Sequence, residues 1–245
     1  MKIIDVSHHQ GIIDWKKVKE AGVEGVIIRA GYGNGNVDKQ WYRNIKGVID
    51  NDFRYIGVYW FSYAYSVSMA LNEGVELEKL IAPYKDKLNL GVYFDWEYDS
   101  MKVAKKHAVM TKDLITNMNI AFCTLLDSDG YIAGYYVNED YQKNWVDVSR
   151  LSKFRKWYAR YSSKAIPTGA YLFQYSSTGQ VYGINTKVDM NRLLAPKTSY
   201  EVAMEVLEGK WDNGVTRKNK LESAGYNYRE VQDLVNDLIR GQIYG

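Results

Sequence analysis

Asp95 and Glu97 stand two positions apart at the end of an otherwise apolar run that begins at residue 90. Side chains alternate along an extended strand, so both carboxyl groups point to the same side. Burying two carboxylates together is costly, and each shifts the pKa of the other, which leaves one able to donate a proton while the other is ionised. Cleavage of a glycosidic bond requires such a pair. The alternative interpretation is that both acids begin an ordinary surface loop, but the pattern favours the functional one.

Two further acids, Asp5 and Asp189, lie on the first and last predicted strands. If the strands close into a barrel, these two are neighbours, and the carboxyl ends of barrel strands gather at one mouth. Each acid alone would be explained equally well as a turn residue or a helix cap. Together with Asp95 and Glu97 they predict a single cleft lined by four acids.

The elements that must position these acids alternate along residues 1 to about 195. Near-continuous Val, Ile and aromatic runs predict strands that are buried on both faces of a mainly parallel sheet. The predicted strands cover residues 3–7, 25–29, 55–61, 90–96, 132–137, 156–159, 170–175 and 187–191, and the predicted helices cover 15–21, 41–51, 69–81 and 101–126. The later connections are too short for full helices. The fold class is therefore α/β, an irregular (β/α) TIM-like barrel with incomplete outer helices.

A different pattern follows Pro196. Thr198 and Glu201 have the spacing of a capping box, and Gly209 would end the helix that they begin. A second short helix is predicted at about 215–224. A third begins at Asn227 and carries apolar residues at i, i+3, i+4 and i+7. We therefore predict two domains, residues 1–196 and a small three-helix module over residues 197–245.

Composition excludes several classes of protein. The chain has 46% hydrophobic and 25% charged residues and a formal net charge of +3, without a polybasic run, so we expect no nucleic-acid partner. No apolar stretch is long enough to insert into a membrane. A single cysteine, Cys123, excludes an internal disulfide framework, and three histidines are too few for a convincing zinc site, so we expect neither metal nor cofactor. The 22 Tyr and 7 Trp residues suit surfaces that stack on sugar rings.

Eight short motifs, in order, resemble those of the glycoside hydrolase family 25 lysozymes. They begin with Asp5-Val6-Ser7-His8-His9-Gln10-Gly11 and Ile13-Asp14-Trp15, continue with Ile28-Arg29-Ala30-Gly31-Tyr32-Gly33, Phe61-Ser62-Tyr63-Ala64, Phe94-Asp95-Trp96-Glu97, Trp157-Tyr158-Ala159-Arg160-Tyr161 and Phe173-Gln174-Tyr175-Ser176-Ser177, and close with Val188-Asp189-Met190-Asn191. The resemblance covers residues 1 to about 195. It departs at Phe173, where the family usually has Trp, which affects packing or stacking and not acid–base chemistry.

The resemblance implies hydrolysis of the β-1,4 bond from N-acetylmuramic acid to N-acetylglucosamine in peptidoglycan. Glu97 matches the general acid, and Asp95 matches the residue that assists the 2-acetamido group or activates water. Asp5 and Asp189 match positioning and electrostatic partners. Whether the configuration is retained by substrate assistance or inverted by direct attack of water is left open. For the sugar subsites we single out Tyr32, Tyr63 and Tyr136, with ordinary core packing as the alternative for each.

The tail resembles the repeat of the Cpl-7 type cell-wall-binding domain. The resemblance is carried by residues 203–207, Gly209-Lys210-Trp211-Asp212-Asn213-Gly214, Arg217-Lys218, Ala224-Gly225-Tyr226-Asn227-Tyr228 and residues 231–238. It implies peptidoglycan glycan-peptide as the ligand, with Trp211, Arg217 and Tyr226 as candidate contacts, although Trp211 would serve equally well in the core of the bundle. Only one copy is present, so we expect weak binding, and self-association into a homo-oligomer is a hypothesis that would restore avidity.

The function that follows is that of an endolysin or lysozyme that causes cell lysis. The chain opens on a strand-like segment without an apolar signal region, so we expect storage in the host cytoplasm, release through a holin pore and action at the cell wall. The alternatives are a bacterial autolysin, an inactive wall-binding protein on a hydrolase scaffold and a chitin-active barrel enzyme. The four intact acids argue against the inactive scaffold. Residues 91–94 lack the acidic run that typically leads into the final Glu of chitin-active enzymes.

Overall fold

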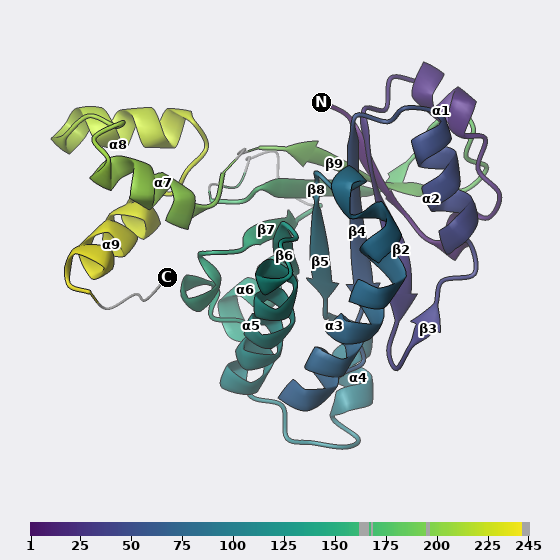
Figure 1. Ribbon diagram of the computed structural model, residues 1–245, viewed down its shortest axis with the longest axis horizontal. Helices are drawn as coiled ribbons and strands as arrows, with labels where there is room; N and C mark the ends of the chain where they lie inside the picture. Colours follow the sequence, from purple (N-terminus) through teal and green to yellow (C-terminus); the bar gives the residue numbers. More distant parts are fainter. Residues whose placement is uncertain (162–166, 168, 195–196, 242–245) are drawn as a thin grey trace.

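A closed barrel of eight strands forms the larger part of the chain (Figure 1). The computed structural model describes residues 1–161, 167, 169–194 and 197–241. The strands are β1 (Ile3–Val6), β2 (Gly25–Tyr32), β4 (Tyr55–Phe61), β5 (Gly91–Asp95), β6 (Ala133–Asn138), β7 (Arg155–Ala159), β8 (Leu172–Gly179) and β9 (Val188–Leu193), with a short β3 (Asn36–Val37) hydrogen-bonded to β2. Pairing of β1 with β2 on one side and β9 on the other closes the ring. The predicted irregular barrel is confirmed.

The direction of β9 differs from that of the other barrel strands. Neighbouring strands from β1 through β2 and β4 to β8 are parallel, whereas β9 runs antiparallel to both β8 and β1. Residues 180–187, which join β8 to β9, are too few for the crossover that a parallel pair needs. Asp189 is therefore the second residue of an antiparallel strand. It reaches the mouth of the barrel from the beginning of its strand, and not from the carboxyl end as expected.

Helices cover the outside of the barrel unevenly. They are α1 (Trp15–Glu20), α2 (Trp41–Asp50), α3 (Val67–Ile81), α4 (Tyr98–Ala104), α5 (Lys112–Ser128) and α6 (Glu139–Asn144), with 3-10 turns η1 (His8–Gln10), η2 (Ala82–Lys87) and η3 (Val148–Leu151). The prediction of a single helix over 101–126 is wrong. This segment contains two helices, because α4 ends at Ala104 and Thr111 caps α5 by accepting a hydrogen bond from the Leu114 N–H.

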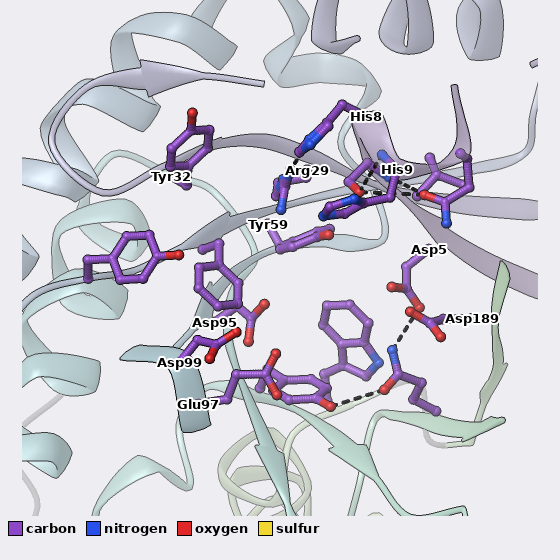
Figure 2. Close-up of a pocket in the computed structure, with 18 of the residues that line it drawn as sticks. Asp5, His8, His9, Arg29, Tyr32, Tyr59, Asp95, Glu97, Asp99 and Asp189 are labelled. Carbon is purple, nitrogen blue, oxygen red and sulfur yellow. Dashed lines mark hydrogen bonds between the residues drawn. The ribbon is translucent and has the colours of Figure 1, made fainter. Parts of the chain in front are cut away.

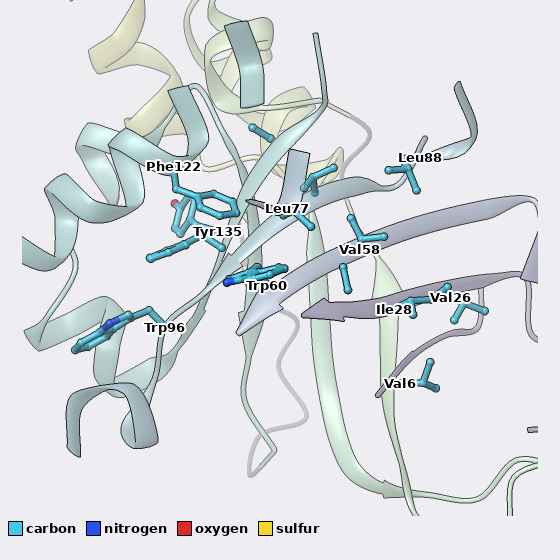
Figure 3. Packing of buried hydrophobic residues seen from close by; sticks show 14 of the residues in the cluster. Val6, Val26, Ile28, Val58, Trp60, Leu77, Leu88, Trp96, Phe122 and Tyr135 are labelled. Carbon is cyan, nitrogen blue, oxygen red and sulfur yellow. The ribbon is translucent and has the colours of Figure 1, made fainter. Parts of the chain in front are cut away.

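Two apolar layers hold the barrel together. The outward faces of the strands pack against the helices, as Val58 and Phe122 show (Figure 3), and α3 and α5 lie side by side. The interior is filled by large aromatic rings around Trp157, which meets Tyr59, Tyr93 and Tyr136 edge-on at ring-centroid distances of 5.8, 5.4 and 5.0 Å. Such pairs contribute about 0.5–1.5 kcal/mol each beyond their burial. The barrel is therefore closed below its mouth by a rigid aromatic floor.

Three helices follow the barrel, α7 (Ser199–Leu207), α8 (Gly214–Ser223) and α9 (Tyr228–Ile239), and they stand to one side of it in Figure 1. They pack around a separate apolar cluster that includes Val202, Leu221 and Val231. The predicted capping box is present, since Thr198 and Glu201 bond reciprocally at the start of α7. The three predicted helices are confirmed, whereas the division at residue 196 stays a prediction, and residues 195–196 lie outside the described residues.

None of the helices in the described ranges is both long and apolar enough to cross a membrane.

Candidate active site

A cavity of about 430 Å³ opens at the mouth of the barrel above the aromatic floor (Figure 2). All four predicted acids line it: Asp5 from β1, Asp95 at the end of β5, Glu97 just after β5, and Asp189 from β9. The structure therefore brings together residues that are up to 184 positions apart in the sequence, from Asp5 to Asp189. Asp99, at the beginning of α4, also lines the cavity and was not predicted.

The alternation expected at the end of β5 is present. Asp95 and Glu97 face the cavity, whereas Trp96 between them points outward, is buried among the helices, and donates from Nε1 to the Ala64 carbonyl at 2.8 Å. The N–H of Glu97 donates to Oγ of Ser100 at 3.1 Å, which fixes the start of α4. Trp96 thus anchors the backbone that carries both acids.

Burial raises the pKa of both acids at the end of β5. The pKa of Glu97 is raised to about 7, first by burial and then by the negative charges of Asp99 and Asp189. The pKa of Asp95 is also raised, by burial and then by the charge of Glu97, while Arg29 acts in the opposite direction. Because each negative charge disfavours the other, the pair loses its protons in two steps. Between these steps one carboxyl group carries a proton and the other is ionised.

Asp5 and Asp189 lie directly opposite each other on β1 and β9. Asp5 is 5% exposed, and two amides donate to its Oδ2, Asn191 Nδ2 at 2.7 Å and Gln174 Nε2 at 2.9 Å. Burial and then the charge of Asp189 raise the pKa of Asp5. Asn191 lies two positions after Asp189 and so on the same face of the strand, which alternation along the strand indicates. The contact of Gln174 with Asp5 has no such local indication.

Asp38, a buried acid outside the predicted four, is the ion-pair partner of Arg29. The guanidinium of Arg29 donates from Nε to Asp38 Oδ2 at 2.8 Å, and the same oxygen lies 3.0 Å from Nδ1 of His8. Burial acts to raise the pKa of Asp38, but hydrogen bonds from the Gln40 N–H, His8 and Arg29 lower it on balance. Arg29 therefore has its close ion pair with Asp38, an acid that was not predicted as its partner, and acts on Asp95 only at longer range. This ion pair fixes η1 at the rim of the cavity.

The three tyrosines singled out for sugar binding all line the cavity, but in different ways. Tyr32 and Tyr63 line it in partly exposed positions. Tyr136 is only 8% exposed, packs edge-on against Trp157, and donates from its hydroxyl to Gln174 Oε1 at 3.0 Å. Its ring is part of the floor. Tyr161, which is 52% exposed and donates to the same Gln174 oxygen at 2.6 Å, lines the cavity as well.

A second cavity of about 750 Å³ adjoins the first. Glu97, Tyr136 and Tyr161 line both, and the second continues over α6 and the end of β7. Glu97 therefore stands where the two cavities meet, so that a ligand that occupies both cavities passes its carboxyl group.

The three candidate contacts in the C-terminal helices are held inside that module. Tyr226 is 3% exposed, and Trp211 meets it edge-on at 6.1 Å and donates to Glu205 Oε2 at 3.2 Å. Arg217 donates to the Asp212 carbonyl at 2.6 Å and to Gln232 Oε1 at 3.2 Å. Trp211 and Tyr226 thus contribute to the core of the bundle, and their role as ligand contacts stays a prediction.

Residues 4–184 match the sequence profile of the glycosyl hydrolases family 25. The chain belongs to this family. Residues 200–239 match the CW_7 repeat. Both matches agree with the resemblances seen in the motifs, and the family 25 match includes three of the four acids, Asp5, Asp95 and Glu97.

Individual relatives agree with this family assignment. The lysozyme of Streptococcus phage Cp-7 is 32% identical over 108 residues, which are 44% of this chain and 28% of the phage protein. The modular autolysin LytC from Streptococcus pneumoniae, solved in complex with a synthetic peptidoglycan ligand, superposes with a TM-score of 0.68 at 30% identity over 78% of this chain and 46% of that protein. The lysozyme from Streptomyces coelicolor, at 20% identity and a TM-score of 0.64, covers 79% of this chain and 91% of its own, and shows the same fold. The chain therefore spans less than half the length of the first two relatives.

Proposed function

We propose that the chain is a lysozyme of the endolysin type, which hydrolyses the β-1,4 bond between N-acetylmuramic acid and N-acetylglucosamine in bacterial peptidoglycan. The observation that carries this proposal is the placement of Glu97, whose pKa of about 7 leaves it protonated up to neutral pH, beside Asp95 in a cleft with two further acids. Family membership and the lysozyme relative support the reaction class. The adjoining second cavity suits a polymer that extends past Glu97 on both sides.

The roles follow from position. Glu97, at the junction of the two cavities, donates its proton to the glycosidic oxygen. Asp95, on the same face of the chain, assists the 2-acetamido group or activates water. Asp5 and Asp189 face them from β1 and β9 and stabilise the positive charge that develops on the sugar ring. Tyr32 and Tyr63, which line the cavity in partly exposed positions, are the residues that we propose to contact the sugars.

We also propose that residues 197–245 bind the glycan-peptide of the wall as a separate domain. The CW_7 match and the separate apolar cluster of α7 to α9 support this. The protein would then act at the bacterial cell wall. Storage in the host cytoplasm before release stays a prediction, as does the choice between a phage endolysin and a bacterial autolysin.

Digestion of purified peptidoglycan tests the reaction. We expect the intact chain to create new reducing ends at muramic acid, identified by mass spectrometry of the products. Glu97→Gln should lower the rate about 100- to 10,000-fold, because it removes the proton donor and keeps the shape of the side chain. Glu20→Gln, the same change at an exposed position of α1, is the control. Release at glucosamine, or full activity of Glu97→Gln, would overturn the proposal, and wall binding without hydrolysis would favour the inactive scaffold.

A further inference from the structure

Five hydrogen bonds connect side chains that line the cleft to one oxygen atom of Asp5. On one side, Gln174 joins Asp5 to two tyrosine hydroxyls. On the other, Asn191 joins Asp5 to the indole of Trp157. Gln174 is 4% exposed and Asn191 is fully buried, so bulk water does not replace these partners. The network is part of the site, but the acid–base steps proposed above do not use it.

The orientation of the Asn191 amide follows from its partner. Trp157 Nε1, 2.8 Å from Asn191 Oδ1, can only donate a hydrogen bond. The oxygen of the amide must therefore face Trp157, and its NH2 group must face Asp5.

The Gln174 amide also has its NH2 group toward Asp5. Its Oε1 lies 3.0 Å from the hydroxyl of Tyr136 and 2.6 Å from that of Tyr161, and these two hydroxyls donate to it. Its NH2 group is left for Asp5 at 2.9 Å. Both amides thus present N–H groups to the same atom, Oδ2 of Asp5.

An oxygen that accepts two N–H bonds has both in-plane lone pairs in use and is a poor place for a proton. Oδ1 is the remaining oxygen of Asp5, and Asp189 is the residue directly across from Asp5 on β9. We propose that Gln174 and Asn191 are positioning residues: by occupying Oδ2 of Asp5 they direct the one proton of the Asp5–Asp189 pair to Oδ1 of Asp5, so that the pair carries one negative charge, on Asp189.

The electrostatic surroundings agree with one shared proton. The pKa of Asp5 is raised on balance, because burial and the charge of Asp189 outweigh the two amides, which act to lower it. The pKa of Asp189 is also raised by burial, and its hydrogen bond with Asp5 acts to lower it. The titratable and charged groups that face this pair from the other strands and from the segments after β5 and β7 are Asp95, Glu97, Arg29, Tyr59, Tyr136 and Tyr161. The role of this single charge in catalysis rests on the proposed function, where it would stabilise the positively charged sugar.

Infrared spectroscopy of the intact chain with ¹³C-labelled aspartate detects the shared proton directly. At neutral pH we expect a protonated-carboxyl band that loses intensity in Asp5→Asn. In Asp189→Asn the band should disappear at a lower pH than in the wild type, because the neighbouring charge that helps to hold the proton on Asp5 is removed while burial remains. A band that disappears at the same pH in Asp189→Asn as in the wild type would overturn the sharing, because burial alone would then hold the proton on Asp5. A band unchanged in both variants would place no proton on this pair.

The positioning role is tested by the pH at which that band disappears. Asn191→Ala removes one N–H that favours the ionised form and should move this midpoint up by about one pH unit. Asn119→Ala, at a 2% exposed amide of α5 outside the cleft, is the matched control and should leave the midpoint in place. If Asn191→Ala does not fold, Gln174→Met makes the corresponding test from the other side. An unmoved midpoint in a folded variant of either residue would reduce that residue to a structural role.

These measurements need no substrate. If the chain fails to hydrolyse peptidoglycan, the proposed function falls while the infrared titration still decides the shared proton. Conversely, hydrolysis by a chain whose spectra lack the shared proton would leave the proposed function intact.

Discussion

At the scale of single residues, the surroundings of Glu97 determine the pH range over which a proton donor is available. Its pKa of about 7 has burial as the main cause and the charge of Asp99 as the second. A general acid must carry its proton, so kcat should fall as the pH rises through about 7. Asp99→Asn removes a negative charge, lowers the pKa of Glu97, and should move this alkaline limb to lower pH. The measurement is kcat on peptidoglycan as a function of pH, with Asp86→Asn, an exposed acid of η2, as control. A limb that stays in place would show that another group sets it.

The residues of the site were predictable only in part. Asp95 and Glu97 could be placed because alternation along one strand is a local property, and Asn191 shares the face of Asp189 for the same reason. Gln174 and Asp38 could not, because their partners come from other strands, and which atoms meet depends on the register of the closed barrel. That register is a long-range property which periodicity does not encode.

At the scale of elements, repeated strand and helix patterns were sufficient to predict the barrel, but not the direction of its last strand. A strand buried on both faces has the same composition whether it runs parallel or antiparallel, so only the length of the connection before β9 indicated its direction. The break between α4 and α5 was missed because apolar residues continue through it, and the decisive feature is the cap at Thr111. Neither error moved an acid away from the cleft.

The contact between α3 and the segment after β4 is a second element-level feature of the site. Glu73 of α3 accepts a hydrogen bond from the Tyr63 N–H at 3.1 Å. Ala64, one residue later, accepts the indole N–H of Trp96. Glu73 thus supports both Tyr63 at the cleft and the backbone between the two acids.

Burial raises the pKa of Glu73 to about 7, from an ordinary value of 4.5. The folded state therefore holds this proton more tightly than the unfolded chain does. The contribution of Glu73 to stability is present in full below about pH 4.5 and is lost as the pH rises to about 7. Glu73→Gln should raise the free energy of unfolding at alkaline pH by about 1–2 kcal/mol and have less effect at acidic pH. Urea unfolding at both pH values checks this, with Glu76→Gln on the same helix as control. A variant that is less stable than wild type at alkaline pH would contradict it.

At the scale of the whole molecule, the barrel and the C-terminal helices have separate apolar cores, and described polar contacts link them. Arg155 at the start of β7 pairs with Glu201 of α7 at 3.1 Å, and the Gly169 N–H donates to the Gly225 carbonyl at 3.1 Å. Strands β1 to β7 begin at the end of the barrel opposite the mouth. The module is therefore attached at the far end from the acids, so the wall binding proposed above would not cover the cleft.

This arrangement predicts that wall binding and bond cleavage can be separated. Deleting residues 198–245 should leave the barrel folded, since the two apolar clusters share no residue, and circular dichroism checks this first. The truncated chain should cleave small soluble muropeptides at a rate close to that of the intact chain, but bind sedimented cell walls at least about tenfold more weakly.

Light scattering of both forms then decides whether the module adds avidity by self-association, since only the intact chain should exceed the monomer mass. Equal wall binding by the two forms would place the affinity in the cleft itself, and a strictly monomeric intact chain would mean that the single repeat binds alone.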